Sequence, residues 1–370
     1  MADPTRDTKP PTTELQNHSE NSTLLPPLYC DDDDASIYFI HTVIPVCIYI
    51  ISALGIPLNL LVLLVFLLHK KACTATEIYL SNMAAADLFL VLFLPFWGIY
   101  VSNGYSWTFG GPMCKIVGSL ISLNYNCSVY FLILVCVDRF LALAHPLSQY
   151  KLRRRKYAKM SCVVVWCFGL LLNIPALVCR NAVEFKPDNK TDHHIKEYTC
   201  RMTCSSEVNQ AKDIVQTVVA FIIPLLIISF CTVRILRALR ERPTTCMEDQ
   251  KTERKVTFLV LAVLLAFLIC WLPFQVQKIV RLAIEFKLIG ESCKLAKLSE
   301  VCLHIFLYLG FFNSDLNPVL YVIVGKNFRM KMWEVLRGSR KKSSGHSASS
   351  TTSSSFLSLR KIEVNVNGVE

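Results

Sequence analysis

Seven long stretches of apolar residues alternate with short polar segments along the chain. Each is close to or above the roughly 20 residues that a helix needs to cross a bilayer, and they fall at 38–68, 76–101, 114–137, 160–179, 212–233, 256–280 and 298–324. The fourth stretch is the shortest, and polar residues interrupt the last. The pattern predicts an all-α membrane protein, a seven-transmembrane helix bundle over residues 38–324.

Polar segments flank this predicted bundle. Residues 1–37 are polar and predict an extracellular N-terminus, residues 325–337 predict a short amphipathic helix on the inner leaflet, and residues 338–370 predict a disordered tail rich in Ser and Thr. Of the 370 residues, 53% are hydrophobic and 18% are charged. That balance is more apolar than is typical of a soluble domain.

The basic residues predict the orientation of the bundle. The loop after the third stretch holds six, at Lys151, Arg153, Arg154, Arg155, Lys156 and Lys159, whereas the loop at 102–112 has none. By the positive-inside rule the N-terminus lies outside and the C-terminus in the cytoplasm of a multi-pass protein of the cell membrane. The net charge of +11 then reflects topology and attraction to membrane lipid, and no nucleic-acid partner is expected.

Two kinds of modification fit the predicted outer face. Glycosylation sequons begin at Asn17, Asn21 and Asn189. Five cysteines are also predicted outside, at Cys30, Cys114, Cys200, Cys204 and Cys293, where the oxidising environment permits disulfides. We expect pairs Cys114–Cys200 and Cys30–Cys293, with Cys204 left over, although sequence leaves other pairings open.

Several polar residues lie inside the apolar stretches and need partners there. Asp87 is the acid of the second stretch, and neutral polar residues recur four apart as Asn124 with Ser128 and Asn313 with Asn317. One acid among neutral oxygens suits a sodium ion. A protonated acid in a hydrogen-bond network, or a polar core that holds helices together, fits equally. No other cofactor is expected.

Asp138-Arg139-Phe140 ends the third stretch, immediately before the basic loop. A charge pair at the predicted inner face is either a latch or an anchor. In the sixth stretch Phe267 and Trp271 precede Pro273, which lacks a backbone donor and kinks a helix. A bulky aromatic at such a hinge is either a rotating switch or a packing residue.

Taken together these residues resemble the rhodopsin-like (class A) G-protein-coupled receptors. The similarity covers residues 38–336 and is carried by Gly55-x-x-x-Asn59, Asp87, Trp107, Cys114, Asp138-Arg139-Phe140, Trp166, Pro224, Phe267-x-x-Cys270-Trp271-Leu272-Pro273 and Asn317-Pro318-Val-Leu-Tyr321. The resemblance implies a heterotrimeric G protein as partner. It also implies that Arg139 is held by Asp138 and Glu253, and that the pair opens when the sixth helix swings outward.

Closer similarity is to the bradykinin receptors, in runs such as Thr76-Glu-Ile-Tyr-Leu80 and Ile269-Cys-Trp-Leu-Pro-Phe-Gln275. It implies a kinin peptide as ligand and signalling through a phospholipase-C-coupled (Gq-type) G protein with calcium release. The ligand-binding residues implied are Ile121, Ser122, Arg180, Asp213, Trp271, Glu285 and Glu300. Neutral Ser122 resembles the type-2 receptors and leaves room for the C-terminal arginine of an intact kinin.

One departure from the bradykinin receptors concerns charge. Arg281 stands where that family places an acid, so Glu300, Glu285 and Asp213 are expected to supply the negative field for a cationic peptide. An angiotensin-like or chemokine-like peptide is the alternative ligand. A transporter would show internal repeats and several intramembrane charges, which we do not find, and no enzymatic constellation is apparent.

The tail after the amphipathic segment carries a cluster of hydroxyl residues. They are Ser349, Ser350, Thr351, Thr352, Ser353, Ser354 and Ser355. In a receptor such a cluster is expected to be phosphorylated by receptor kinases and to recruit arrestin through charge-assisted contacts. The alternative is a solvating linker.

Overall fold

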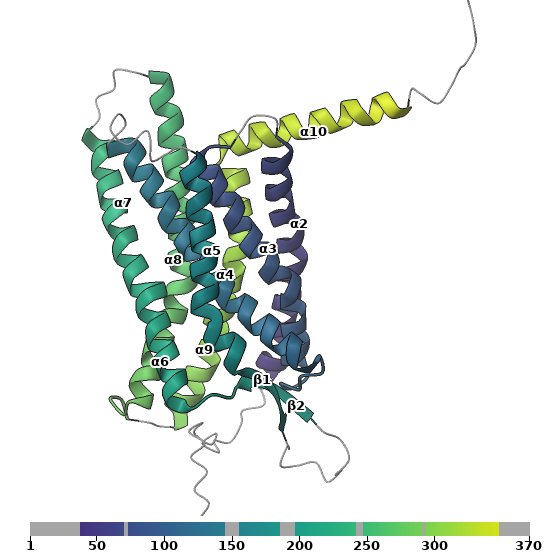
Figure 1. Cartoon of the computed structure of the whole chain (residues 1–370), viewed down its shortest axis with the longest axis vertical. Helices are drawn as coiled ribbons and strands as arrows, with labels where there is room; N and C mark the ends of the chain where they lie inside the picture. The colour runs from purple at the N-terminus through teal and green to yellow at the C-terminus, as the bar shows by residue number, and fades with distance from the viewer. Residues whose placement is uncertain are drawn as a thin grey trace, which may run out of the picture.

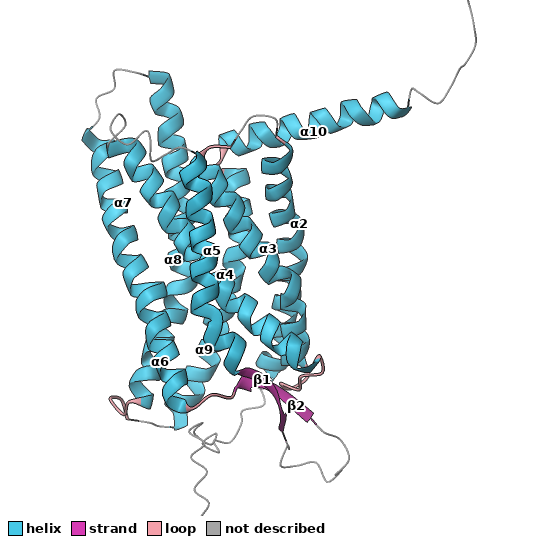
Figure 2. Ribbon diagram, viewed as in Figure 1, coloured by secondary structure: helices cyan, strands magenta, loops and turns pink. Residues whose placement is uncertain are grey.

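The structure is a computed structural model that describes residues 38–69, 73–144, 155–185, 197–241, 247–290 and 293–347. It is a bundle of long helices with one antiparallel strand pair at one end (Figures 1 and 2). The elements are η1 (Phe39–Val43), α2 (Ile44–Leu68), α3 (Ala75–Ser102), α4 (Gly110–Ala144), α5 (Arg155–Cys179), β1 (Arg180–Phe185), β2 (Glu197–Met202), α6 (Ser206–Thr217), η2 (Val218–Ile222), α7 (Ile223–Glu241), α8 (Met247–Glu285), α9 (Cys293–Ile323) and α10 (Lys326–Ser347). We call the end with β1 and β2 the hairpin end, and the opposite end, which α10 crosses, the α10 end.

The helices are long enough and apolar enough to span a membrane. Among the described residues six pass that test alone, and a seventh is reached if Val301–Ile323 and Asn327–Arg337, bent by 83°, are counted together. Apolar side chains such as Leu67, Val163 and Leu226 are exposed on the outside of the bundle, as lipid contact requires. The predicted seven-helix, all-α fold is confirmed.

The core lies where α2, α3, α4, α8 and α9 face one another. Ile48, Leu94, Phe131 and Phe311 are completely or almost completely buried there. Because both the core and the outer surface are apolar, packing rather than hydrophobicity alone decides which face of a helix points inward.

The start of α3 is defined by its sequence. Thr74 Oγ1 accepts a hydrogen bond from the Glu77 backbone N–H at 3.3 Å, and the Glu77 carboxylate accepts one from the Thr74 N–H at 2.9 Å. This reciprocal capping box satisfies two backbone donors that a helix N-terminus leaves unpaired. It places Thr76, the second residue of α3, at the α10 end of the bundle.

Two tyrosines of α4 bond to backbone carbonyls just before Pro224, where η2 meets α7. Proline has no N–H, so Pro224 can make neither an α-helical bond to the Ala220 carbonyl nor a π-helical bond to the Val219 carbonyl, at the point where η2 passes into α7. The Tyr125 and Tyr130 hydroxyls, both from α4, donate to Ala220 and Val219 respectively, each at 2.6 Å. In lipid such carbonyls have no water to bond, so side-chain donors stabilise the break.

The last helix, α10, turns sharply away from the bundle (Figure 1). It runs from Lys326 to Ser347 and so extends beyond the predicted end at residue 337. Phe328 is buried against the rings of Phe66 and Tyr321. Lys331 adds an ion pair to Glu77 at 2.7 Å, which joins α10 to the capping box of α3.

Candidate functional site

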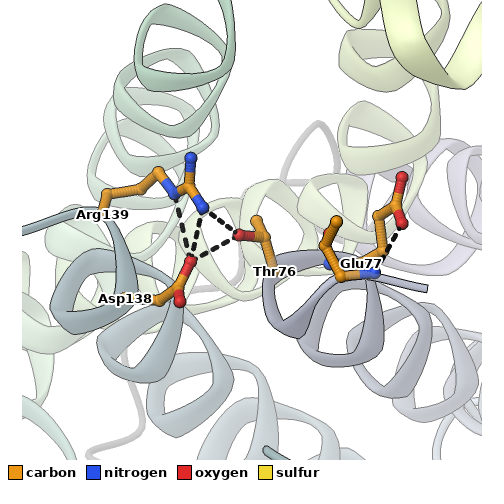
Figure 3. Close-up of polar contacts among 5 residues, drawn as sticks. Thr76, Glu77, Asp138 and Arg139 are labelled. Carbon is orange, nitrogen blue, oxygen red and sulfur yellow. Dashed lines mark hydrogen bonds and ion pairs between the residues drawn. The ribbon is translucent and has the colours of Figure 1, made fainter. Parts of the chain in front are cut away.

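A buried ion pair lies at the α10 end of the bundle, where α3 meets α4. Arg139 Nη2 lies 2.6 Å and Nε 3.2 Å from Asp138 Oδ2, and both residues are about as buried as core side chains. Thr76 completes the cluster, because its hydroxyl donates to Asp138 at 2.6 Å and accepts from Arg139 Nη2 at 2.8 Å (Figure 3). A buried charge needs such compensation.

Thr76 was not singled out by the sequence, where it is one residue of an ordinary helix start. Nothing in the local sequence signals its contact with Arg139, 63 residues away along the chain. The other predicted partner, Glu253, belongs to α8, and its side chain lies outside the described residues. Phe140 packs its ring at 6.1 Å from that of Phe230.

Halfway along the bundle, Asp87 of α3 accepts hydrogen bonds from three neutral side chains on two helices, α4 and α9. Asn124 Nδ2 donates at 2.8 Å, Ser314 Oγ at 2.9 Å and Asn317 Nδ2 at 3.0 Å. Ser128 lies one turn from Asn124 and is buried on α4. The structure therefore brings Asn124 and Asn317 of the predicted polar set, together with Ser314, onto one carboxylate.

The donor chemistry around Asp87 fits a hard cation. The side-chain oxygens of Asn317, whose amide bonds Asp87, and of Asn313, one turn earlier on α9, are buried and accept no hydrogen bond within the described part of the chain. A carboxylate and neutral oxygens are the ligands that a hard cation prefers. A second acid, Asp315, is also buried, and its two oxygens likewise accept no hydrogen bond from described residues. The sequence offered no account of Asp315, and its burial makes it a second costly acid in the bundle.

Trp271 occupies the centre of an aromatic cluster next to the proline in α8. Its ring centroid lies 4.7 Å from that of Tyr125 and 6.4 Å from that of Phe267. Gly310 of α9 faces it, and a Cβ there would come within 2.8 Å of the indole. The glycine thus makes room for the indole between α8 and α9, while Pro273 removes a backbone donor one half-turn away.

Among the described residues, two disulfides hold the hairpin end together. Cys114–Cys200 is present, as predicted, and ties α4 to β2. The prediction that Cys204 is left over was wrong, because Cys204 pairs with Cys179, the last residue of α5. Cys179 ends an apolar stretch, so its sequence context suggested a packed thiol. Cys30 lies outside the described residues, as does the side chain of Cys293.

Arg180 follows the second disulfide directly and begins β1. Its guanidinium lies 5.9 Å from the ring centroid of Trp97, a cation–π contact, and its side chain covers Gly118 of α4, where a Cβ would collide with it. Burial lowers the pKa of this guanidinium, although arginine remains charged in proteins. Its Nε is buried and donates no hydrogen bond among the described residues.

A polar chain crosses from α4 to α8 at the same end. Gln216 of α6 donates to Ser122 Oγ at 3.4 Å and accepts from Lys278 Nζ at 3.3 Å. Lys278 also lies 3.4 Å from Asp213 Oδ1, and Lys212 lies 3.2 Å from the same oxygen. Asp213 was expected to attract a cationic peptide, but two lysines neutralise its charge.

The remaining predicted ligand residues are less closely joined. Ile121 is partly buried against the core, and Glu285 is exposed near the end of α8. The side chain of Glu300 lies outside the described residues, as do Asn17, Asn21, Asn189 and the hydroxyl cluster at 349–355. Gln216 was missed because an amide in a helix carries no distinctive sequence signal.

The chain matches a known family of proteins over most of the bundle. The family model of the 7 transmembrane receptor (rhodopsin family) matches residues 58–321. The chain therefore belongs to this family and is a G-protein-coupled receptor that crosses the membrane several times.

Comparison with known proteins narrows the class. The chain is similar to the B2 bradykinin receptor of Homo sapiens, 39% identical over 301 residues that cover 81% of this chain and 75% of the relative. The B2 bradykinin receptor of Oryctolagus cuniculus is 41% identical over 280 residues, 75% of each chain. The B1 bradykinin receptor of Macaca mulatta is 34% identical over 334 residues, 88% of this chain and 92% of the relative. The chain is a peptide receptor of the bradykinin-receptor type, and its relatives are receptors rather than enzymes.

Proposed function

We propose that this receptor binds a kinin at its hairpin end and activates a phospholipase-C-coupled (Gq-type) G protein at its α10 end, with release of calcium. The proposal that the α10 end activates a G protein rests on the buried cluster of Asp138, Arg139 and Thr76. A buried pair held by a neighbouring helix has a closed state and an open one, which is what a switch requires. The kinin assignment is supported by the similarity of the chain to the bradykinin receptors.

The disulfides support the proposed orientation. Both Cys114–Cys200 and Cys179–Cys204 lie at the hairpin end, and disulfides persist on the oxidising side of a membrane. We place this end outside the cell and α10 in the cytoplasm, which agrees with the basic loops. Trp333 and Leu336, exposed on α10, then contact lipid of the inner leaflet.

The peptide would meet Arg180 on entering the hairpin end. A buried guanidinium over Trp97 with an unpaired Nε supplies charge-assisted donors for a peptide carboxylate or carbonyl. Trp271 and Ile121 lie deeper and would contact apolar side chains. Contact that displaces Trp271 toward or away from Gly310 would alter α8, the helix whose movement the switch needs.

Calcium release in cells that express the full chain tests this function. We expect a dose-dependent response to kinin, and none to angiotensin or a chemokine. A response to either of those instead would overturn the kinin assignment. Arg139→Ala is the control variant, since it should keep kinin binding and lose the calcium signal; binding without signal in the parent chain would overturn the Gq coupling.

Sodium is proposed as an allosteric ion at Asp87. Asn124, Ser128, Asn313 and Asn317 would supply its neutral oxygens, and the ion would hold α3, α4 and α9 together by replacing the present hydrogen bonds to the carboxylate. Replacing sodium by choline at constant ionic strength should change agonist affinity in the parent chain. Asp87→Asn should remove that dependence, and an unchanged dependence would rule the site out.

The hydroxyl cluster at 349–355 is proposed as the target of receptor kinases and the binding element for arrestin. Phosphates there would bind basic side chains of the partner. Alanine substitution of the cluster should leave calcium release intact and impair agonist-driven internalisation. Normal internalisation would favour a solvating linker instead.

A further inference from the structure

The wall formed by α4, α6 and α8 at the hairpin end carries excess positive charge. Lys278 projects from α8 with only 14% of its side chain exposed, so its ammonium needs a compensating anion. The acid it contacts is Asp213, but Asp213 Oδ1 is shared with Lys212. Two ammonium groups therefore share one carboxylate.

Other cations near this wall add to the excess. Arg281 lies three residues after Lys278 on the same helix and is exposed, with no ion pair among the described residues. Arg180, the first residue of β1 at the same end, also lacks an acidic partner in the described part of the chain. The acids described on α6 and at the hairpin end of α8 are Asp213, already shared, and Glu207 and Glu285, which are exposed.

The position of Lys278 changes the meaning of Ser122. By sequence, a neutral serine leaves room for a cationic C-terminal side chain. In the structure one amide, that of Gln216, separates Ser122 Oγ from the Lys278 ammonium. A guanidinium that entered beside Ser122 would lie close to an ammonium of like charge in a site shielded from water, where repulsion is strong.

We propose that Lys278 is a specificity determinant that binds the terminal carboxylate of the peptide and disfavours a cationic side chain at that terminus. The proposal rests on the proposed kinin function and predicts that a kinin without its C-terminal arginine binds more tightly than the intact peptide. Lys212 keeps Asp213 paired when Lys278 turns to the ligand. No acid is then left buried without a partner.

Competition binding on membranes with the full chain tests the proposal. Three peptides are compared: the intact kinin, the kinin lacking its C-terminal arginine, and the C-terminal amide of that shorter peptide. In the parent chain the shorter acid should bind about tenfold more tightly than either of the others, the difference expected from one charge contact.

Three variants separate charge from packing. Lys278→Gln should abolish the difference between acid and amide and should favour the intact kinin, whereas Lys278→Arg keeps the charge and should keep the preference. Lys212→Gln is the matched charge control: it removes the other ammonium from the same acid and should weaken the preference without abolishing it, because Asp213 then competes with the ligand for Lys278. Surface labelling confirms that each variant reaches the membrane.

The outcomes distinguish this inference from the function on which it rests. If no peptide binds the parent chain, the proposed kinin function fails, and the inference fails with it. If the peptides bind but the intact kinin is preferred, or if Lys278→Gln still discriminates acid from amide, only the role of Lys278 is overturned.

Discussion

Both ends of the bundle bury a cation, but they compensate its charge in opposite ways. At the α10 end Arg139 has its own acid, Asp138, and a hydroxyl from Thr76 that contacts both. At the hairpin end Lys278 must share Asp213 with Lys212. One charge cluster is complete within the protein, and the other is not.

The difference indicates what each cluster is suited to do. A complete pair stabilises one arrangement of helices and is lost when they separate, so it suits a switch. An incomplete one is stabilised by an anion from outside, so it suits recognition of a ligand. The hairpin end is also covalently tied, whereas among the described residues the α10 end is held by hydrogen bonds and ion pairs.

The largest effect is expected when a disulfide of the hairpin end is removed. The Cys179→Ser/Cys204→Ser double variant opens the connection between α5 and α6 across 25 residues, and loss of a disulfide that closes such a loop costs about 2–4 kcal/mol. We expect a lower melting temperature in detergent and weaker peptide binding, because Arg180 adjoins Cys179. Cys167→Ser, which changes an exposed free thiol, is the control and should melt like the parent.

Loosening the switch should act on signalling rather than on stability. Thr76→Val keeps the shape but removes two hydrogen bonds to charged groups, each typically worth about 1.5–3 kcal/mol. If that loss favours the open state, ligand-independent calcium signalling should rise about tenfold. Glu253→Ala should act in the same direction. Basal signalling at the parent level in both variants would argue that Asp138 and Arg139 form an anchor.

A smaller effect, on stability, is expected at the helix break next to Pro224, which lies between the two ends. Tyr125→Phe leaves the Ala220 carbonyl buried without a donor, which should lower the free energy of unfolding by about 1–3 kcal/mol. Tyr130→Phe should cost less, since Tyr130 is only partly buried. Equal melting temperatures for the two variants would show that the carbonyls find other donors.

The smallest effect is expected where α10 meets α3. Lys331→Gln removes the charge from the ion pair with Glu77. The Glu77 carboxylate keeps its hydrogen bond from the Thr74 N–H and a glutamine can still donate to it, so we expect a loss of about 1 kcal/mol. Stability should therefore change little. A modest rise in basal signalling would connect α10 to the switch through the helix start that carries Thr76, and an unchanged value would confine α10 to anchoring.

The sequence by itself determined the class of fold and several local features. The lengths of the apolar stretches determined the spans, because any backbone inside a bilayer must pair its own hydrogen bonds and helices do so within one segment. The same reasoning made Asp87 and the Asp138–Arg139 pair conspicuous, since charged groups in apolar stretches are costly. Cys114–Cys200 was an expected pair, but the sequence assigned three further cysteines to the same side and left other pairings open.

Only the tertiary structure decided which distant residues meet. Thr76 reaches Arg139, Cys204 bonds Cys179, and Lys278 lies one amide from Ser122 because α3, α5 and α8 pack against particular neighbours. Hydropathy places a helix in the membrane but carries little information on its rotation, since lipid and core are equally apolar. The charge that a ligand meets depends on that rotation, and so Ser122 appears neutral in the sequence and lies beside a cation in the fold.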